Sequence, residues 1–353
     1  AWAATVGIAL AAGPLVGGLV TDGLGWRWIF LVNVPLGLAA LAVVRPAIAE
    51  SFGPRRPLDP LGLGLLTLSL VALVFGTVRA GADGWSAPAI VSAFAIGVVA
   101  LAAFVAFELR ASAPTVDLRL LRHGRLAAFV LAAFTLGAGF LGTFVFLSVY
   151  QQGGLGASAM EAGLRLLPIT AVYALTAALA GRRLLAGTDL VALLAAGMTA
   201  IAAGLLLMLL AGPDTSWTVL LPGFLLAGVG WGIANPAMVE GALSAVAPAA
   251  AGMASGMLNF ARQAGLAAGV AALGSAFHHA VAQRLDAGAA AVDAVAGGAT
   301  APGARVALAH GIDVVALAGA AIIVVGTATS LLLARGRQAR SFAMPLPEPT
   351  PAG

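Results

Sequence analysis

The stretch from Gly7 to Gly37, GIALAAGPLVGGLVTDGLGWRWIFLVNVPLG, decides the fold. It consists of two apolar runs joined by a short polar turn. Gly13 and Gly17 lie four residues apart and share a helix face, with Gly18 beside them, so a second helix can approach closely there. Pro14 cannot donate a backbone hydrogen bond, so the helix can bend at that point. The stretch predicts two membrane helices, although small residues at this spacing are common wherever membrane helices pack.

The composition of the whole chain supports the same interpretation. Hydrophobic residues make up 61% of its 353 residues and charged residues 9%, and the mean hydropathy is +1.03. Soluble proteins carry roughly 25% charged residues, so the chain is predicted to be an integral membrane protein. It has no Cys and no Lys, which excludes thiolate metal sites, P-loop lysines and Schiff bases; we expect no cofactor. Its arginines are scattered over short loops, so we expect no nucleic-acid partner.

Apolar runs long enough to cross a bilayer recur along the chain. A hydrocarbon core about 30 Å thick needs about 20 apolar helical residues, whereas a membrane barrel would show alternating strands of about 10 residues. The sequence therefore predicts an all-α polytopic membrane protein with ten transmembrane helices. The runs are 2–20, 27–45, 61–79, 88–108, 126–150, 164–181, 190–211, 217–238, 252–277 and 312–334.

The loops show a charge bias that predicts orientation. If the first run crosses outward from the cytoplasm, twelve arginines fall in inner loops and the C-terminal tail and five in outer loops, with Arg262 inside a run. The positive-inside rule favours this arrangement. We therefore expect a multi-pass protein of the plasma (inner) membrane, with both ends of the chain cytoplasmic.

Two motifs in the opening stretch are those of a known family. GPLVGG, which contains Gly13, Pro14, Gly17 and Gly18, and the following GWRWIFLVNVPLG resemble the antiporter motif of drug:proton antiporters in the major facilitator superfamily, closest to its fourteen-helix branch. In that family the motif lies on the fifth helix. Because the chain begins with it, and with Ala1, the resemblance implies an N-terminally truncated fragment without the first four helices.

The resemblance also implies a division into domains. Residues 1–45 would be the last two helices of the N-terminal bundle, and 46–125 two extra linker helices with cytoplasmic loops. Residues 126–334 would form the C-terminal six-helix bundle, and the Pro-rich segment 335–353 a disordered cytoplasmic tail. The first helix is expected to pack on the run 164–181, and the N-terminal bundle to be incomplete.

Candidate substrate-binding residues lie in two of the runs. Phe140, Phe144 and Gln151 lie near one helical face and could line a cavity for flat, hydrophobic substrates, or form an interfacial aromatic belt. Trp231 and Asn235 lie in a Gly-rich run that resembles the family's path-lining tenth helix; the alternative is a Pro kink with its amide satisfied locally. With the facing bundle incomplete, we expect the aromatic residues and Asn235 to be exposed in an open groove.

A polar cluster lies inside the run 252–277. Asn259, Arg262 and Gln263 are three to four residues apart and share a face. An arginine at this depth is costly unless it is paired, hydrated or snorkelling. The segment resembles the family's penultimate helix, so we predict a polar or proton-coupling role, with Arg262 facing protein or water and Asn259 or Gln263 beside it.

Few other polar groups lie near the runs. Glu240 and Asp313 stand at run ends, and the resemblance places the proton-coupling carboxylate on the family's first helix, which has no counterpart here. The neighbours His278 and His279 cannot share a helix face, and with His310 they make a poor metal site, so none is expected.

These observations predict function. The leading hypothesis is a secondary active transporter that exports hydrophobic or cationic small molecules, such as drugs and antibiotics, in exchange for protons by alternating access. Its partners would be the substrate, protons and the lipid bilayer, and it would be a monomer. The alternatives are an exporter of one metabolite or antibiotic and an inert truncated membrane scaffold. A membrane-embedded enzyme is not expected, because the acidic residues Asp286 and Asp293 lie in an outer loop.

Overall fold

A computed structural model describes residues 13, 16–47, 59–84, 87–111, 114, 116–180, 188–212, 215–286, 288–298 and 301–335. All regular structure in these ranges is helical, and nine of their helical segments are long and apolar enough to cross a membrane. They correspond to nine of the ten predicted runs. The other run, 2–20, lies largely outside the described residues, although 16–24 are helical. The predicted all-α membrane fold is therefore confirmed.

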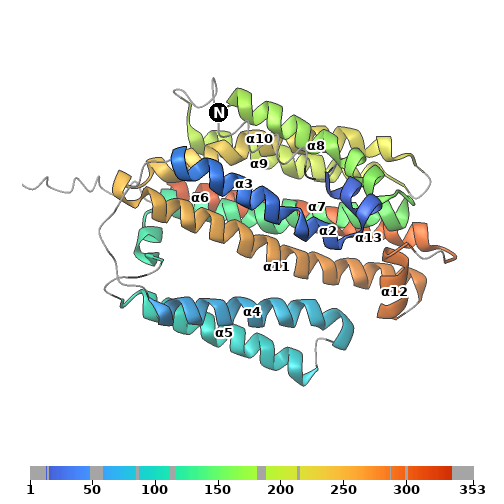
Figure 1. Cartoon of the computed structure of the whole chain (residues 1–353), viewed down its shortest axis with the longest axis horizontal. Coiled ribbons are helices and arrows are strands. Elements are labelled where there is room, and N and C mark those ends of the chain that lie inside the picture. The colour runs from blue at the N-terminus through green and yellow to red at the C-terminus, as the bar shows by residue number, and fades with distance from the viewer. Residues whose placement is uncertain are drawn as a thin grey trace, which may run out of the picture.

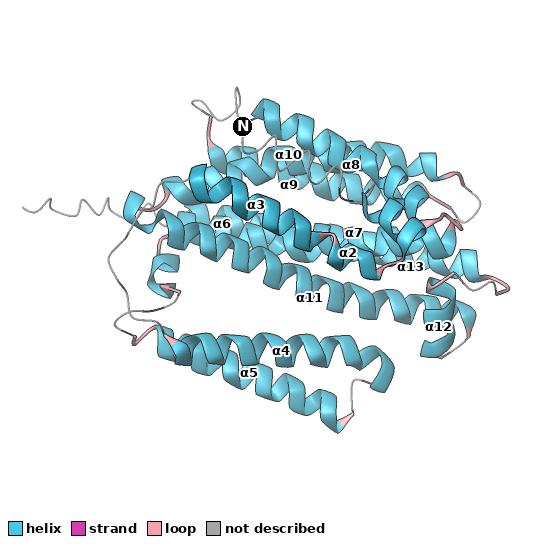
Figure 2. Ribbon diagram, viewed as in Figure 1, coloured by secondary structure: helices cyan, strands magenta, loops and turns pink. Residues whose placement is uncertain are grey.

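Figures 1 and 2 show the helices running roughly along one common direction. A bilayer offers no hydrogen-bond partners, so a spanning chain must satisfy its backbone groups internally, as helices do. The main elements are α2 (Arg27–Leu31), α3 (Asn33–Ala47), α4 (Pro60–Asp83), α5 (Pro88–Glu108), α6 (Gly124–Thr135), α7 (Gly142–Val149), α8 (Ala159–Leu179), α9 (Leu190–Leu207), α10 (Leu221–Ser244), α11 (Ala251–Leu285), α12 (Ala289–Ala296) and α13 (Ala304–Arg335).

Short helices of other types join or interrupt these elements. Two π-helical turns, η2 (Leu136–Leu141) and η3 (Tyr150–Gly154), flank α7, so one span runs from Gly124 to Gly154. Each π turn inserts extra residues into the helix and shifts the face that later side chains occupy. The remaining short helices are 3₁₀ turns: η1 (Leu118–Arg122), η5 (Met208–Leu210), η6 (Trp217–Leu220) and η7 (Pro248–Ala250).

The last two long helices exceed their predicted bounds. α11 has 35 residues and at 1.5 Å per residue is about 50 Å long, so it extends past a hydrocarbon core of about 30 Å. α13 begins at Ala304 rather than at 312. The apolar runs did not predict these extensions, because hydropathy identifies only the apolar part of a helix. The more polar ends of the two helices continue into the headgroup region.

Helices α6 to α13 pack around one core, and glycine allows close crossings in it, including that of α9 and α10. On α9, a Cβ added at Gly197 would lie 2.6 Å from the carbonyl oxygen of Gly230, and one at Gly204 would lie 2.7 Å from that of Gly223, both on α10. Lipid tails are as apolar as leucine side chains, so helix association in a membrane depends on such close backbone packing.

Helices α4 and α5 form an antiparallel hairpin beside α11, at the bottom of Figure 1. The hydroxyl of Ser69 on α4 donates to the carbonyl oxygen of Gly97 on α5, at 2.9 Å, and joins the two helices. By contrast, the membrane-length segment Arg27–Arg45 has no buried residue. The domain boundaries at 45, 125 and 334 stay predictions. Of the proposed tail 335–353, Arg335 is the last residue of α13, and the rest lies outside the described residues.

The close contact of α9 and α10 at Gly197 predicts that a glycine-to-alanine substitution lowers stability there but not at an open position. Gly197→Ala should lower the free energy of unfolding by about 1–3 kcal/mol, because its Cβ cannot fit unless the helices separate. Gly256→Ala on α11 meets no atom within 4 Å, and should be neutral or stabilising by up to about 1 kcal/mol through helix propensity. Unfolding of both variants in mixed detergent, followed by loss of helical circular dichroism, measures the difference. Equal stabilities would contradict the glycine account.

Candidate functional site

Four aromatic side chains from three spans meet inside the bundle. The ring centroids of Phe140 on η2 and Trp231 on α10 are 5.3 Å apart, and those of Phe140 and Phe144 are 6.5 Å apart. Tyr173 on α8 stacks on Trp231 at 4.1 Å with an interplanar angle of 30°. We call Phe140, Phe144, Tyr173 and Trp231 the aromatic cluster. Phe140 and Phe144 are neighbours on one span, whereas Tyr173 and Trp231 come from spans distant in sequence, so helix packing brings the three spans' rings together.

One amide lies within this cluster. The side-chain nitrogen of Asn235 donates to the hydroxyl oxygen of Tyr173 at 3.1 Å. Asn235 is four residues after Trp231, so both project from the same face of α10. The side-chain oxygen of Asn235 is buried and has no hydrogen-bond partner among the described residues. The cluster therefore presents large aromatic surfaces together with one acceptor that is available to a ligand.

Glycines on α10 explain why α8 comes so close. A Cβ added at Gly232 would lie 2.6 Å from the Cβ of Thr176 and 2.9 Å from the carbonyl oxygen of Tyr173. One added at Gly228 would lie 2.6 Å from the carbonyl oxygen of Ile169. The missing side chains let the α8 backbone settle onto α10, and this places the ring of Tyr173 over that of Trp231.

The cluster is closed, which corrects the expectation of an open groove. Phe140 is fully buried, and only 7% of Trp231 and 5% of Asn235 is exposed. The expectation assumed that these side chains face a missing bundle. Instead, Tyr173 covers Trp231 and binds Asn235, so helices within the same bundle supply the cover. Phe144 is only partly buried and lies at the edge of the cluster.

Gln151 belongs to a different polar group. It lies eleven residues after Phe140, about 16 Å along a helix. Its side-chain oxygen accepts from the Arg165 guanidinium at 3.3 Å, and Arg165 also lies 3.8 Å from the Glu161 carboxylate. Glu161 in turn completes a capping box with Ser158 at the start of α8. Gln151 therefore ties the end of one span to the beginning of the next, away from the aromatic cluster.

Asn259 lies beside Arg262, as predicted. The Arg262 guanidinium donates to the side-chain oxygen of Asn259 at 2.8 Å. Arg262 is half-buried, whereas Asn259 and Gln263 are exposed. The hydrogen bond to Asn259 pairs the Arg262 charge with an amide on the same face of α11.

Of the candidate antiporter-motif glycines, Gly18 makes the predicted kind of contact. A Cβ added there would lie 2.6 Å from the Cα of Met160, at the beginning of α8. Gly13 and Gly17 have no atom within 4 Å of such a Cβ, and Pro14 lies outside the described residues. This contact lies at the first turn of α8, before the predicted run 164–181, so packing of the first helix on that run stays a prediction.

A hydrogen bond strengthens this contact. The Asp22 carboxylate accepts from the backbone N–H of Met160 at 3.0 Å, across 138 residues of sequence. The first N–H groups of a helix lack partners within it, and the helix dipole favours a negative charge there. The Asp22 carboxylate supplies a hydrogen-bond acceptor and a negative charge at the beginning of α8.

Within the part of the chain that the structure describes, no three His, Asp or Glu side chains are close enough to hold a metal ion together. His278 instead lies 3.6 Å from the Asp293 carboxylate.

The sequence analysis missed Tyr173, Asp22 and Arg165 as participants. Tyr173 had a weak signal, because the chain contains only two tyrosines and this one lies in the middle of an apolar run. Asp22 and Arg165 sit at run ends, where charged residues are ordinary. Only their partners in space distinguish them.

Comparison with known proteins now settles the family. The model of the Major Facilitator Superfamily matches residues 1–270. The chain belongs to that superfamily. This confirms the resemblance inferred from the opening motifs. Because this is a family of transporters, it also confirms that the chain is not an enzyme.

The relatives include proteins named for the transport, export or efflux of antibiotics and drugs. The chain is 36% identical over 291 residues to a probable actinorhodin transporter of Streptomyces coelicolor, covering 78% of this chain and 50% of that protein. It is 32% identical to the tetracenomycin C resistance and export protein of Streptomyces glaucescens (77% and 51%) and 30% identical to the multidrug efflux pump LfrA of Mycolicibacterium smegmatis (78% and 55%). The chain spans about half the length of the curated relatives it matches.

The Asp22 contact can be tested by crosslinking, because the chain has no native cysteine. The double variant Asp22→Cys/Met160→Cys should be joined by a short bifunctional thiosulfonate, since the native carboxylate lies 3.0 Å from the Met160 nitrogen. Gly23→Cys/Met160→Cys is the matched control, because a Cβ at Gly23 meets no atom within 4 Å. Proteolysis between the two positions followed by electrophoresis detects the crosslink. Equal crosslinking of both pairs would contradict the placement of the helix 16–24.

Proposed function

We propose that this protein is a secondary active exporter of hydrophobic or cationic small molecules, and that the aromatic cluster with Asn235 forms part of the substrate site. The observation that carries the proposal is the meeting of four aromatic rings with an amide whose oxygen has no hydrogen-bond partner in the part of the chain that the structure describes. Small-molecule sites combine large apolar and aromatic surfaces with a few polar groups that fix orientation. Export is supported by the names of the relatives, which include an antibiotic transporter and a multidrug pump.

A flat aromatic cation suits this chemistry. It could replace the ring of Tyr173 on the face of Trp231, where stacking and cation–π attraction would hold it. A donor group on the substrate would then reach the side-chain oxygen of Asn235. Since the cluster is closed, binding requires the ring of Tyr173 to move off Trp231. This is a rearrangement within one bundle, and it would accompany the rocking of the two bundles in alternating access.

We also propose that export is coupled to protons. Asp313 on α13 is half-buried, and one of its carboxylate oxygens is buried without a hydrogen-bond partner in the described residues. Ionisable groups inside membrane helices commonly serve proton relays. Asp313 is therefore our candidate for a proton-carrying carboxylate in this chain, with the half-buried Arg262 as a second coupling group. We further propose a monomer in the plasma membrane with both ends cytoplasmic.

The alternative is an exporter of a single compound. Two of the relatives carry the name of one antibiotic each, actinorhodin and tetracenomycin C. A panel of unrelated cations and antibiotics separates the two possibilities, because a multidrug pump protects cells against several of them and a dedicated exporter against one. A membrane scaffold would protect against none.

The substrate site is tested by Trp231→Ala in bacteria that lack their own efflux pumps. Loss of a stacked aromatic worth about 1–2 kcal/mol should slow ethidium efflux roughly tenfold. Phe75→Ala on α4 is the control, because Phe75 is 49% exposed and lies outside the cluster; its efflux should match that of the wild type. In the wild type, a protonophore should stop efflux. Full efflux by Trp231→Ala would refute the site, and efflux that withstands the protonophore would refute proton coupling.

A further inference from the structure

An apolar groove separates the α4–α5 hairpin from the main bundle. It has a volume of about 720 Å³ and is bounded by α4, α5, α6, α11 and η1. Its walls include Leu73, Phe104, Leu121 and Phe134. The α11 side of the groove carries mostly short side chains, alanines such as Ala264 and Ala268. These small side chains leave the groove unfilled by the described residues.

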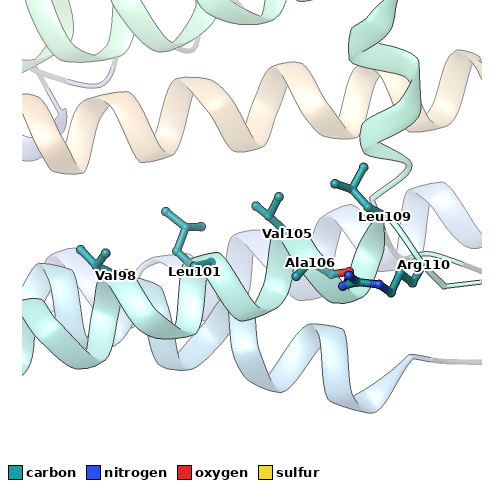
Figure 3. A pocket seen from close by; sticks show the side chains of 7 residues that line it. Val98, Leu101, Val105, Ala106, Leu109 and Arg110 are labelled. Carbon is teal, nitrogen blue, oxygen red and sulfur yellow. The ribbon is translucent and has the colours of Figure 1, made fainter.

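A second hollow continues this groove along α5. Its volume is about 640 Å³, and Leu101 lines both spaces. Figure 3 shows Val98, Leu101, Val105 and Leu109 projecting from the same side of α5, with Arg110 at the end of the row. The two hollows together form a long apolar surface with a guanidinium at one end.

The polar side chains along the groove are already satisfied. The hydroxyl of Ser69 donates to the carbonyl oxygen of Gly97 at 2.9 Å, and that of Thr77 donates to the carbonyl oxygen of Leu73 at 2.7 Å. An occupant therefore finds no free hydrogen-bonding group there. This favours hydrocarbon chains over a drug with polar substituents, which would leave those substituents unpaired.

The short helix η1 closes one end of the groove and is amphipathic. Leu118 and Leu121 line the groove, whereas Arg119 and Arg122 are exposed. The Arg119 guanidinium donates to two carbonyl oxygens at the end of α5, those of Leu109 at 3.0 Å and Ala111 at 3.4 Å. Arg119 thereby fixes η1 beside the groove and leaves Arg122 pointing outward.

Further arginines surround this end, and the nearby carboxylates face the backbone. Arg125 is exposed, like Arg122. Asp59 accepts from the N–H of Gly62 at the start of α4, and Asp117 from that of Arg119. Glu108 is buried and accepts from the N–H of Val116. Each of these three carboxylates keeps its negative charge. The four arginines at this end, Arg110, Arg119, Arg122 and Arg125, outnumber them by one, so the described residues leave a small net positive charge there.

We propose that the groove binds an anionic phospholipid, with its acyl chains between α5 and α11 and its phosphate at Arg110, Arg122 and Arg125. A phospholipid has the same arrangement as the site, hydrocarbon along its length and a charge at one end. Basic pockets between membrane helices bind anionic headgroups in this way. The lipid would fill the space between hairpin and bundle and hold α4–α5 in place.

The test compares two lipids with the same acyl chains. The purified protein is mixed with phosphatidylglycerol and phosphatidylcholine, and bound lipid is counted by native mass spectrometry. The wild type should prefer phosphatidylglycerol, and Arg122→Gln/Arg125→Gln should reduce that preference about thirtyfold. The control Arg284→Gln/Arg305→Gln removes two exposed arginines at the opposite end of the bundle, near α12 in Figure 1, and should keep the preference.

A second pair of variants tests the apolar part. Ala268→Phe fills the groove and should lower binding of both lipids, whereas Val324→Phe, on an exposed face of α13 outside the groove, should not. Equal binding of the two lipids by the wild type would overturn the proposal, and so would equal losses in the two double-arginine variants. Displacement of the lipid by ethidium would also overturn it, because the groove would then be a substrate site.

Discussion

The need to satisfy every backbone polar group without water governs this structure. This need makes each span a helix. The lipid tails, which are as apolar as leucine side chains, remove the hydrophobic driving force that brings helices together in water. The helices associate instead through close backbone contacts, which glycine makes possible. Gly197 and Gly204 bring α9 onto α10, and Gly228 and Gly232 bring α10 onto α8. The stacking of Tyr173 on Trp231 depends on these crossings.

The same constraint applies to the long span that carries Phe140. Two π turns interrupt it, at Leu136–Leu141 and Tyr150–Gly154. In the first turn, a Cβ at Gly139 would lie 2.7 Å from the carbonyl oxygen of Gly319 on α13. The turn thus combines a wider helix with a close crossing, and Phe140 lies within it, fully buried against Trp231. π turns occur frequently at functional sites, which agrees with the proposed substrate site.

Much of the fold could be predicted from the sequence, because the length and apolar composition of a run are enough to identify a membrane helix. Phe140, Phe144, Trp231 and Asn235 could be singled out as unusual residues in apolar runs. Their arrangement could not, since Tyr173 reaches Asn235 across 62 residues and Asp22 reaches Met160 across 138. No local pattern encodes such pairs. The expectation of an open groove failed for this reason, because it left out the cover that α8 supplies.

The central claim is that the aromatic cluster binds substrate when the bundle opens. Thiol labelling at its edge tests this most directly in a chain without cysteine. Phe144→Cys lies beside Phe140, whereas Val145→Cys is the next residue and is 41% exposed on another face. The account predicts that ethidium slows maleimide labelling at position 144 and leaves labelling at position 145 unchanged. Equal effects of ethidium at both positions, or none at position 144, would contradict it.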